Sequence, residues 1–282
     1  MEKLKYLQEL STQVRRDIIR MVHNASSGHP GGSLGCVEYM VALYFEIMNH
    51  NPAEFSIDGK NQDMFFLSNG HISPLWYSVL ARAGYFDVTE LSTFRKIDSR
   101  LQGHPATAEK LPGIRIASGS LGQGLSVAIG AALAKKLNNE NNLVFSLHGD
   151  GEIEEGQIWE AAMFAAAKKV DNIIATIDWN DKQIDGPVHE VLNQGDLEAK
   201  WKAFGWDVLI INNGNNITEV IDILNKAKTM TGKGKPIMIL MKTEMGAGVD
   251  FMMGTHKWHG SAPNDEQTEK ALAQLPETLG DF

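Results

Sequence analysis

The chain has 282 residues, of which 43% are hydrophobic and 22% charged, and its formal net charge is −9. This length allows a sizeable core, and the acidic balance argues against a general nucleic-acid surface. The single cysteine, Cys36, excludes an internal disulfide framework and favours a reducing, cytoplasmic location. We expect no secretory leader, and no run of 18 apolar residues predicts a membrane span.

The first part of the chain alternates helices with glycine-rich loops. Apolar residues at three- and four-residue spacing predict an amphipathic helix from residue 3 to about 24. A glycine-rich loop follows at residues 26–35, and His29 is its only titratable side chain. We expect a second helix at about residues 37–48 and a short buried strand at residues 64–67.

Two further loops carry a glycine-flanked histidine, His71 and His104. A single loop histidine is more often solvated or a cap. Three of them with glycine neighbours are hard to explain by packing. A shared metal is the alternative, but their wide separation is not a local ligand pattern.

The rest of the chain alternates apolar runs with helical patterns. A glycine-rich entry at residues 117–124 precedes a small-residue helix to about residue 137. The later predicted strands cover residues 143–147, 173–177, 206–211 and 236–241, the helices about 155–168, 196–204, 217–228 and 265–275, and a long irregular segment spans 246–260. This alternation predicts an α/β fold with a doubly wound, mostly parallel sheet flanked by helices. We expect one domain over residues 1–282.

Oxygen-bearing side chains follow two of these strands. Asp150 comes after the strand at 143–147, and Asn180 after the strand at 173–177. A right-handed crossover brings both loops to the same edge of a parallel sheet, where a carboxylate and an amide oxygen suit Mg²⁺. Gly149 and Gly151 let the backbone approach a ligand, and the following helix offers its N–H groups to an anion. Metal and anion together indicate a bound diphosphate, although a Gly-Asp-Gly tripeptide alone is commonly a turn.

Seven motifs occur in a characteristic order. They are Gly28-His29-Pro30-Gly31, Ser68-Asn69-Gly70-His71, Gly103-His104-Pro105, Gly119-Ser120-Leu121-Gly122-Gln123-Gly124, Gly149-Asp150-Gly151, Asn180 and His256-Lys257-Trp258-His259-Gly260. In this order they resemble the N-terminal region of transketolases, over residues from about 10 to 262. The resemblance implies the thiamine diphosphate-binding fold of the diphosphate type, with thiamine diphosphate and Mg²⁺ as cofactors.

The resemblance also implies roles for individual residues. Mg²⁺ would be held by Asp150, Asn180 and the main-chain oxygen of Lys182. His29 and His104 would line the sugar channel, and His71 and His259 would approach the diphosphate and the reaction centre. Glu155 and Glu160 would join a carboxylate network between paired active sites. The implied cofactor-binding set is His71, Gly119, Ser120, Leu121, Gly149, Asp150, Gly151, Glu155, Glu160, Asn180 and His259, and the catalytic set is His29, His71, His104 and His259.

The chain departs from the family pattern in two ways. Trp179 stands where the family often has an acidic residue or Asn. The pyrimidine-binding and C-terminal domains of full-length transketolases have no counterpart in these residues. We therefore expect the partner to be a separate C-terminal transketolase subunit, in a heterotetramer of two copies of each chain. We expect sugar phosphates as substrates, and neither nucleic acid nor a membrane as a partner.

Two alternative functions remain. The chain could be half of a deoxyxylulose-phosphate synthase-like or 2-oxo-acid dehydrogenase-like enzyme, or a non-catalytic cofactor-binding regulator.

Overall fold

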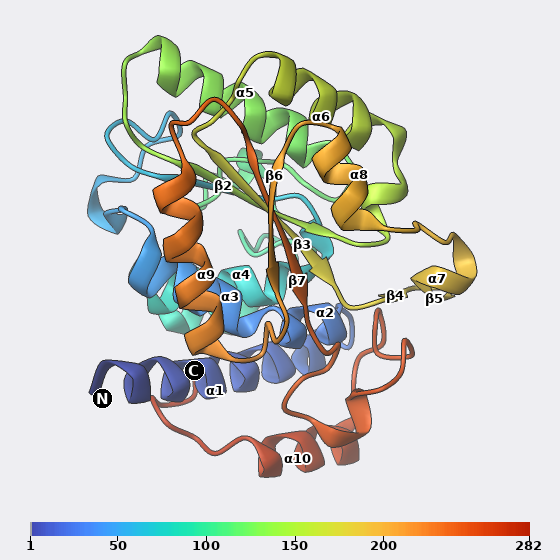
Figure 1. Cartoon of the computed structure of the whole chain (residues 1–282). Coiled ribbons are helices and arrows are strands. Elements are labelled where there is room, and N and C mark those ends of the chain that lie inside the picture. Colours follow the sequence, from blue (N-terminus) through green and yellow to red (C-terminus); the bar gives the residue numbers. More distant parts are fainter. Residues whose placement is uncertain (1) are drawn as a thin grey trace.

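The centre of the molecule is a parallel sheet of five strands (Figure 1). The computed structural model describes residues 2–282. In spatial order the strands are β1 (Met64–Leu67), β2 (Val144–Gly149), β3 (Ile173–Trp179), β7 (Ile237–Lys242) and β6 (Asp207–Ile211). Every neighbouring pair is parallel. Helices bury both faces of such a sheet, which explains the nearly continuous apolar runs of its strands.

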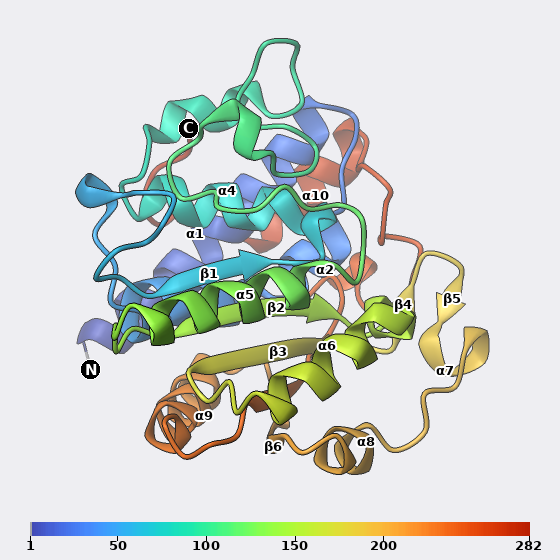
Figure 2. The same cartoon turned by 90° about the horizontal axis from the view of Figure 1, so that it is seen from above.

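Helices cover the sheet in two layers (Figure 2). One layer contains α5 (Gly124–Leu137), α6 (Gly156–Ala167) and α8 (Leu197–Ala203), and the other α1 (Glu2–Asn24), α3 (Val37–Ala42), α4 (Ser73–Arg82) and α9 (Ile217–Met230). The path from β1 through β2 and β3 to β6 advances in one direction, whereas the step from β6 to β7 goes back. Right-handed crossovers therefore place α9 on the opposite face from α5, α6 and α8.

Shorter elements complete the chain. The helix α10 (Asp265–Gln274) packs on α1. The remaining elements are α2 (Pro30–Gly35), η1 (Leu43–Ile47), η2 (Pro52–Glu54), η3 (Gly70–Ile72), η4 (Val88–Thr93), η5 (Thr107–Glu109), η6 (Glu152–Glu154), β4 (Lys182–Gln183), β5 (Gly186–Pro187), α7 (Val188–Val191) and η7 (Asp250–Met252).

The structure confirms the predicted fold class and every predicted strand. The predicted helix at residues 37–48 is divided into α3 and the π-helix η1, and several helices were not predicted, among them α2, α4 and α7. Residues 30–35, expected as part of a loop, form the short helix α2. The helix α4 is absent from the sequence-based prediction. Residues 73–81 of α4 are all buried, so α4 lacks the polar face on which a helical period depends.

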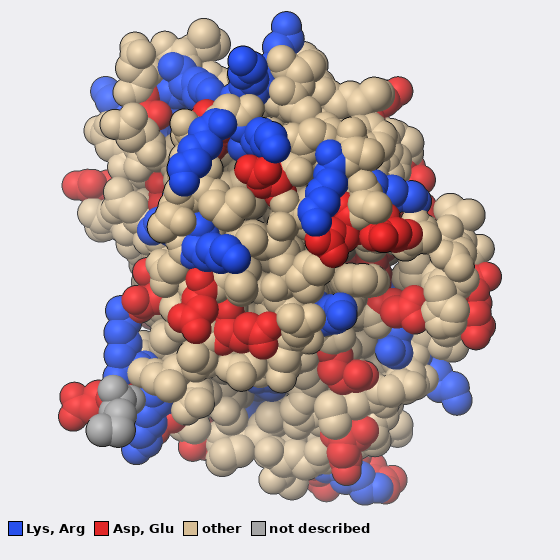
Figure 3. Space-filling view, viewed as in Figure 1, with Lys and Arg blue, Asp and Glu red and all other residues tan. Residues whose placement is uncertain are grey.

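The surface carries charges of both signs. Lys and Arg are interspersed with Asp and Glu on the face shown in Figure 3. Among residues 2–282, no helix is long and apolar enough to cross a membrane.

Candidate active site

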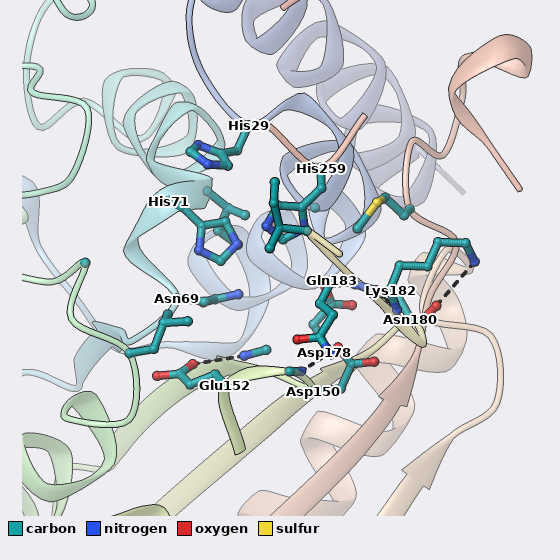
Figure 4. Close-up of a pocket in the computed structure, with 18 of the residues that line it drawn as sticks. His29, Asn69, His71, Asp150, Glu152, Asp178, Asn180, Lys182, Gln183 and His259 are labelled. Atoms are coloured by element: carbon teal, nitrogen blue, oxygen red, sulfur yellow. Dashed lines mark hydrogen bonds between the residues drawn. The ribbon is translucent and has the colours of Figure 1, made fainter. Parts of the chain in front are cut away.

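A cavity of about 330 Å³ lies at the carboxyl edge of the sheet. The segments that follow β1, β2, β3 and β7 all contribute to its lining, because parallel strands place these connections at the same edge. Figure 4 shows histidines on one side of this cavity and the carboxylates of Asp150 and Asp178 on the other. The cavity therefore combines proton-transfer groups with oxygen ligands.

Four histidines from distant parts of the sequence meet here. The ring of His29 lies 5.1 Å from that of His71, 5.7 Å from that of His259 and 6.3 Å from that of His104, measured between centroids. His71 and His259 are also 5.1 Å apart. The structure thus brings together the four histidines that the motifs single out.

The segment that carries His259 is fixed to the start of the chain. The Gly31 N–H donates to the Trp258 carbonyl at 3.0 Å, and a Cβ on Gly31 would lie 2.8 Å from that same oxygen. The Arg15 guanidinium donates to the Ala247 carbonyl at 2.8 Å. These contacts hold the irregular 246–260 segment against α1 and α2, and its His259 lines the cavity.

Burial controls the protonation of the cluster. Desolvation lowers the pKa of His29 to about 4, and the neighbouring His259, Arg95 and His104 act in the same direction. Desolvation lowers the pKa of His71 well below its usual range, and burial also lowers the pKa of His104 and His259. Each ring is therefore neutral near pH 7, with one nitrogen that donates and one that accepts.

The histidine cluster predicts an acid-sensitive fold. Between about pH 4 and 6.5 the folded state binds fewer protons at His29 than the unfolded chain does. The neutral His29 ring therefore makes its full contribution to the stability of the fold above pH 6.5. This contribution is lost as the pH falls through the window. Urea unfolding measured across the window should show a falling free energy of unfolding. His29→Asn should flatten the slope, whereas His23→Asn, outside the cluster, should not. An identical slope in His29→Asn would contradict the assignment.

The opposite side of the cavity holds buried oxygen donors. The Asp150 carboxylate accepts the N–H groups of Gly151 at 2.9 Å and Asp181 at 2.5 Å. The amide nitrogen of Asn180 donates to Asp178 at 2.7 Å, which turns the Asn180 oxygen away from that carboxylate. The same oxygen accepts the Lys182 N–H at 2.8 Å. Asp178 thus orients the amide of Asn180.

Two buried carboxylates make this side favourable for a cation. Burial raises the pKa of Asp150 well above its usual range, and the Asp178 charge adds to this effect, against the N–H groups of Asp181 and Gly151. Burial also raises the pKa of Asp178, against its hydrogen bonds from Thr243, Cys36 and Asn180. Nowhere in residues 2–282 do three or more His, Cys, Asp or Glu side chains gather to hold a metal ion. The Asp150 carboxylate and the Asn180 amide oxygen at this edge are oxygen donors of the kind that suits Mg²⁺.

Three buried polar residues of the cavity lining were not assigned from the sequence: Asn69, Glu152 and Asp178. All three are buried, and the Asn69 side-chain oxygen has no hydrogen-bond partner. Burial would raise the pKa of Glu152, but the His148 imidazole and hydrogen bonds from Ser68 and Gly122 lower it below its usual range. Each of the three lies within or close to one of the seven motifs. This closeness is the feature of the sequence that could have marked them as site residues.

The other predicted site residues divide into two groups. Gly119, Leu121, Gly149, Gly151 and Lys182 line the cavity. Ser120, Glu155 and Glu160 are exposed and lie outside this lining. Glu155 borders the same loop, because a Cβ on Gly122, whose φ is +83°, would lie 2.7 Å from the Glu155 Cβ.

Trp179 also lies outside the cavity lining. The Lys242 ammonium sits 5.4 Å from the centre of its ring. A tryptophan in place of the family's usual acidic residue or Asn therefore leaves the cavity-facing groups of Asn180 in place.

Comparison with known proteins identifies the family of this fold. The family described as "Transketolase, thiamine diphosphate binding domain" matches residues 8–278. The chain belongs to the transketolase family. The resemblance drawn from the motifs is thus confirmed, and the matched domain of transketolase is the one that binds thiamine diphosphate.

Transketolase relatives include short chains and long ones. The 6-deoxy-6-sulfo-D-fructose transketolase subunit SqwG of a Clostridium species is 39% identical, with 95% of this chain and 96% of the relative covered. An apulose-4-phosphate transketolase subunit of Actinobacillus succinogenes is 37% identical, with 95% of each covered. The solved transketolase from Leishmania mexicana superposes with a TM-score of 0.89 at 29% identity, over 98% of this chain but only 42% of that one.

Proposed function

We propose that this chain is the diphosphate-binding subunit of a two-chain transketolase, with residues 1–282 forming a single domain. The observation that carries the proposal is the similarity to relatives that are named as transketolase subunits. The chain covers nearly all of two relatives that are named as transketolase subunits, and less than half of a solved transketolase. A second chain would supply the pyrimidine-binding and C-terminal domains. Together the two chains would transfer a two-carbon ketol unit from a ketose phosphate to an aldose phosphate.

The cavity would hold thiamine diphosphate with Mg²⁺. The Asp150 carboxylate, the Asn180 amide oxygen and the Lys182 main-chain oxygen would bind the metal, in keeping with the buried oxygens at the strand ends. Thiamine diphosphate supplies an electron sink for cleavage beside a ketose carbonyl. The chain itself would bind and orient the diphosphate through Gly119, Leu121, Gly149, Gly151, His71 and His259. Three predicted site residues lie outside the cavity lining: Ser120, Glu155 and Glu160. They would act where the partner chain completes the site.

The histidine cluster would bind the sugar and transfer protons. His71 and His259 would lie toward the diphosphate and the reaction centre, and His29 and His104 along the sugar channel. Their neutral rings can donate to hydroxyl groups and accept protons near neutral pH. Such donors and acceptors suit a polyhydroxy substrate, which favours a sugar over a simple 2-oxo acid.

An exposed apolar surface on α5 and α6 supports a partner chain. Val127 on α5 and Met163 and Phe164 on α6 are 42%, 55% and 46% exposed. The neighbouring Gly119 and Ser120 are exposed as well. Apolar side chains on adjacent helices are typical of an interface. We assign this face to the assembly, a heterotetramer of two copies of each chain. The buried free thiol of Cys36 accords with a cytoplasmic enzyme.

A two-chain assay tests the proposal. The chain is expressed with and without a candidate chain that carries a pyrimidine-binding domain. Xylulose 5-phosphate, ribose 5-phosphate, thiamine diphosphate and Mg²⁺ are added, and sedoheptulose 7-phosphate is followed. We expect product only when both chains are present.

The controls of this assay separate the possible outcomes. Activity of the purified single chain would contradict the two-chain proposal. A folded complex that binds cofactor but forms no product would move the search to other substrates. 6-Deoxy-6-sulfo-D-fructose and apulose 4-phosphate come first in that panel because of the relatives' names. Failure with every sugar, followed by turnover of a 2-oxo acid, would favour the dehydrogenase-like alternative.

A further inference from the structure

Glu152 occupies a central position beneath the cavity (Figure 4). It begins the short helix η6, directly after the Gly149-Asp150-Gly151 loop. Its side chain is 2% exposed although it carries a carboxylate. A buried carboxylate is costly unless donors surround it, so its contacts require an explanation.

Donors from three separate segments surround this carboxylate. One oxygen accepts the Ser68 hydroxyl and, at 2.8 Å, the Gly122 N–H. The other oxygen accepts the Gly149 N–H at 3.0 Å, and the His148 Nδ1 atom lies 3.8 Å from it. Ser68 in turn accepts the Gly124 N–H at 3.1 Å, which extends the network to the first residue of α5.

Each of the three segments also supplies lining residues of the cavity. Ser68 precedes Asn69 and His71 after β1. Gly122 follows Gly119 and Leu121, and Gly149 precedes Asp150. One side chain thus connects the loop that bears a histidine, the loop next to α5 and the loop that bears the carboxylate ligand.

We propose that Glu152 is a positioning residue that fixes these three segments in their binding arrangement and thereby sets the affinity for thiamine diphosphate. The proposal rests on the cofactor assignment made above. Glu152 need not touch the cofactor itself. It acts through the Ser68 hydroxyl and the main-chain N–H groups of Gly122 and Gly149.

The chemistry of the site requires a carboxylate. The two oxygens of Glu152 together accept three donors. In Glu152→Gln an amide nitrogen replaces one oxygen, and its hydrogens then oppose an N–H group or a hydroxyl. A buried donor left without an acceptor is unfavourable, so at least one segment has to move. The volume of the side chain is nearly unchanged.

Glu152→Gln therefore tests the proposal, with Glu154→Gln as the matched control. Glu154 lies in the same helix η6 but is only half-buried, and Gln183 donates to it at 3.4 Å. We expect calorimetry in saturating Mg²⁺ to show thiamine diphosphate binding weakened by about 10- to 100-fold in Glu152→Gln, as for other supporting residues of metal sites. The control should bind as the parent does, and both variants should keep the parental circular dichroism.

Hydrogen exchange in the cofactor-free protein provides a second measurement that does not depend on activity. The amides of residues 119–124 and 149–152 should exchange faster in Glu152→Gln, while those of β6 and α9 should not change. A general loss of stability would accelerate both sets. A folded Glu152→Gln with parental affinity and parental exchange would overturn the proposal.

Ser68→Ala covers the case in which Glu152→Gln does not fold. It removes one donor to the carboxylate and should weaken cofactor binding by about tenfold. Parental affinity in Ser68→Ala would then overturn the proposal. The two proposals can fail separately. If the complex has no transferase activity but the variants still lose cofactor affinity, the result counts against the proposed reaction and supports the role of Glu152.

Discussion

Replacing Asp150 with alanine is expected to abolish Mg²⁺-dependent binding of thiamine diphosphate while leaving the fold intact. Asp150 is the only assigned metal ligand that carries a negative charge, and the loop around it joins β2 to η6. Removing it takes away the attraction for the divalent cation that neutralises the diphosphate. Because burial and Asp178 already raise the pKa of this carboxyl group, its loss also relieves a desolvation cost in the free protein.

Calorimetry with and without Mg²⁺ measures this effect directly. Asp150→Ala should show no cofactor binding at concentrations that saturate the parent. The two lost hydrogen bonds should lower the free energy of unfolding by about 1–3 kcal/mol. Asp185→Ala is the matched control, because Asp185 is an exposed carboxylate in the neighbouring hairpin. Unchanged cofactor affinity in Asp150→Ala would refute the metal assignment.

Replacing His29 with alanine is expected to impair the reaction and spare the cofactor. Its ring lies with those of His71 and His259 on the side of the cavity opposite Asp150 (Figure 4). Loss of a proton-transfer group of this kind lowers turnover by about 100-fold or more. Lost contacts to sugar hydroxyls would raise KM in addition. Thiamine diphosphate affinity should stay at the parental level.

Steady-state kinetics of the reconstituted two-chain complex, together with calorimetry, test this separation. His23→Ala serves as control, because His23 lies at the end of α1, where its Nδ1 donates to the Pro263 carbonyl at 3.2 Å and its Nε2 lies 3.4 Å from Asp265. If His29→Ala loses cofactor binding instead of turnover, then His29 belongs to the diphosphate side of the cavity. Parental kinetics would remove His29 from the catalytic set.

The pattern of strands and motifs could be predicted because its causes are local. Buried parallel strands are almost continuously apolar, as in residues 173–177, and polar turns bound them on both sides. Asp150 and Asn180 could be placed at one edge because the handedness of the crossover is nearly invariant. The helix α4 was missed for the opposite reason, because burial on all sides removes the polar face that makes a helix recognisable.

The sequence by itself determined the fold class and the family, and it singled out candidate site residues, because these follow from local periodicity and from short motifs in a fixed order. Only the tertiary structure decided how those residues act together. His29 and His259 are far apart in the chain, yet their rings are 5.7 Å apart, and the contacts that unite them come from Gly31 and Arg15. Two of the three donors to Glu152, Ser68 and Gly122, come from segments that the sequence does not show to be its neighbours. Burial, and therefore each shifted pKa, depends on such long-range packing, which no local pattern specifies.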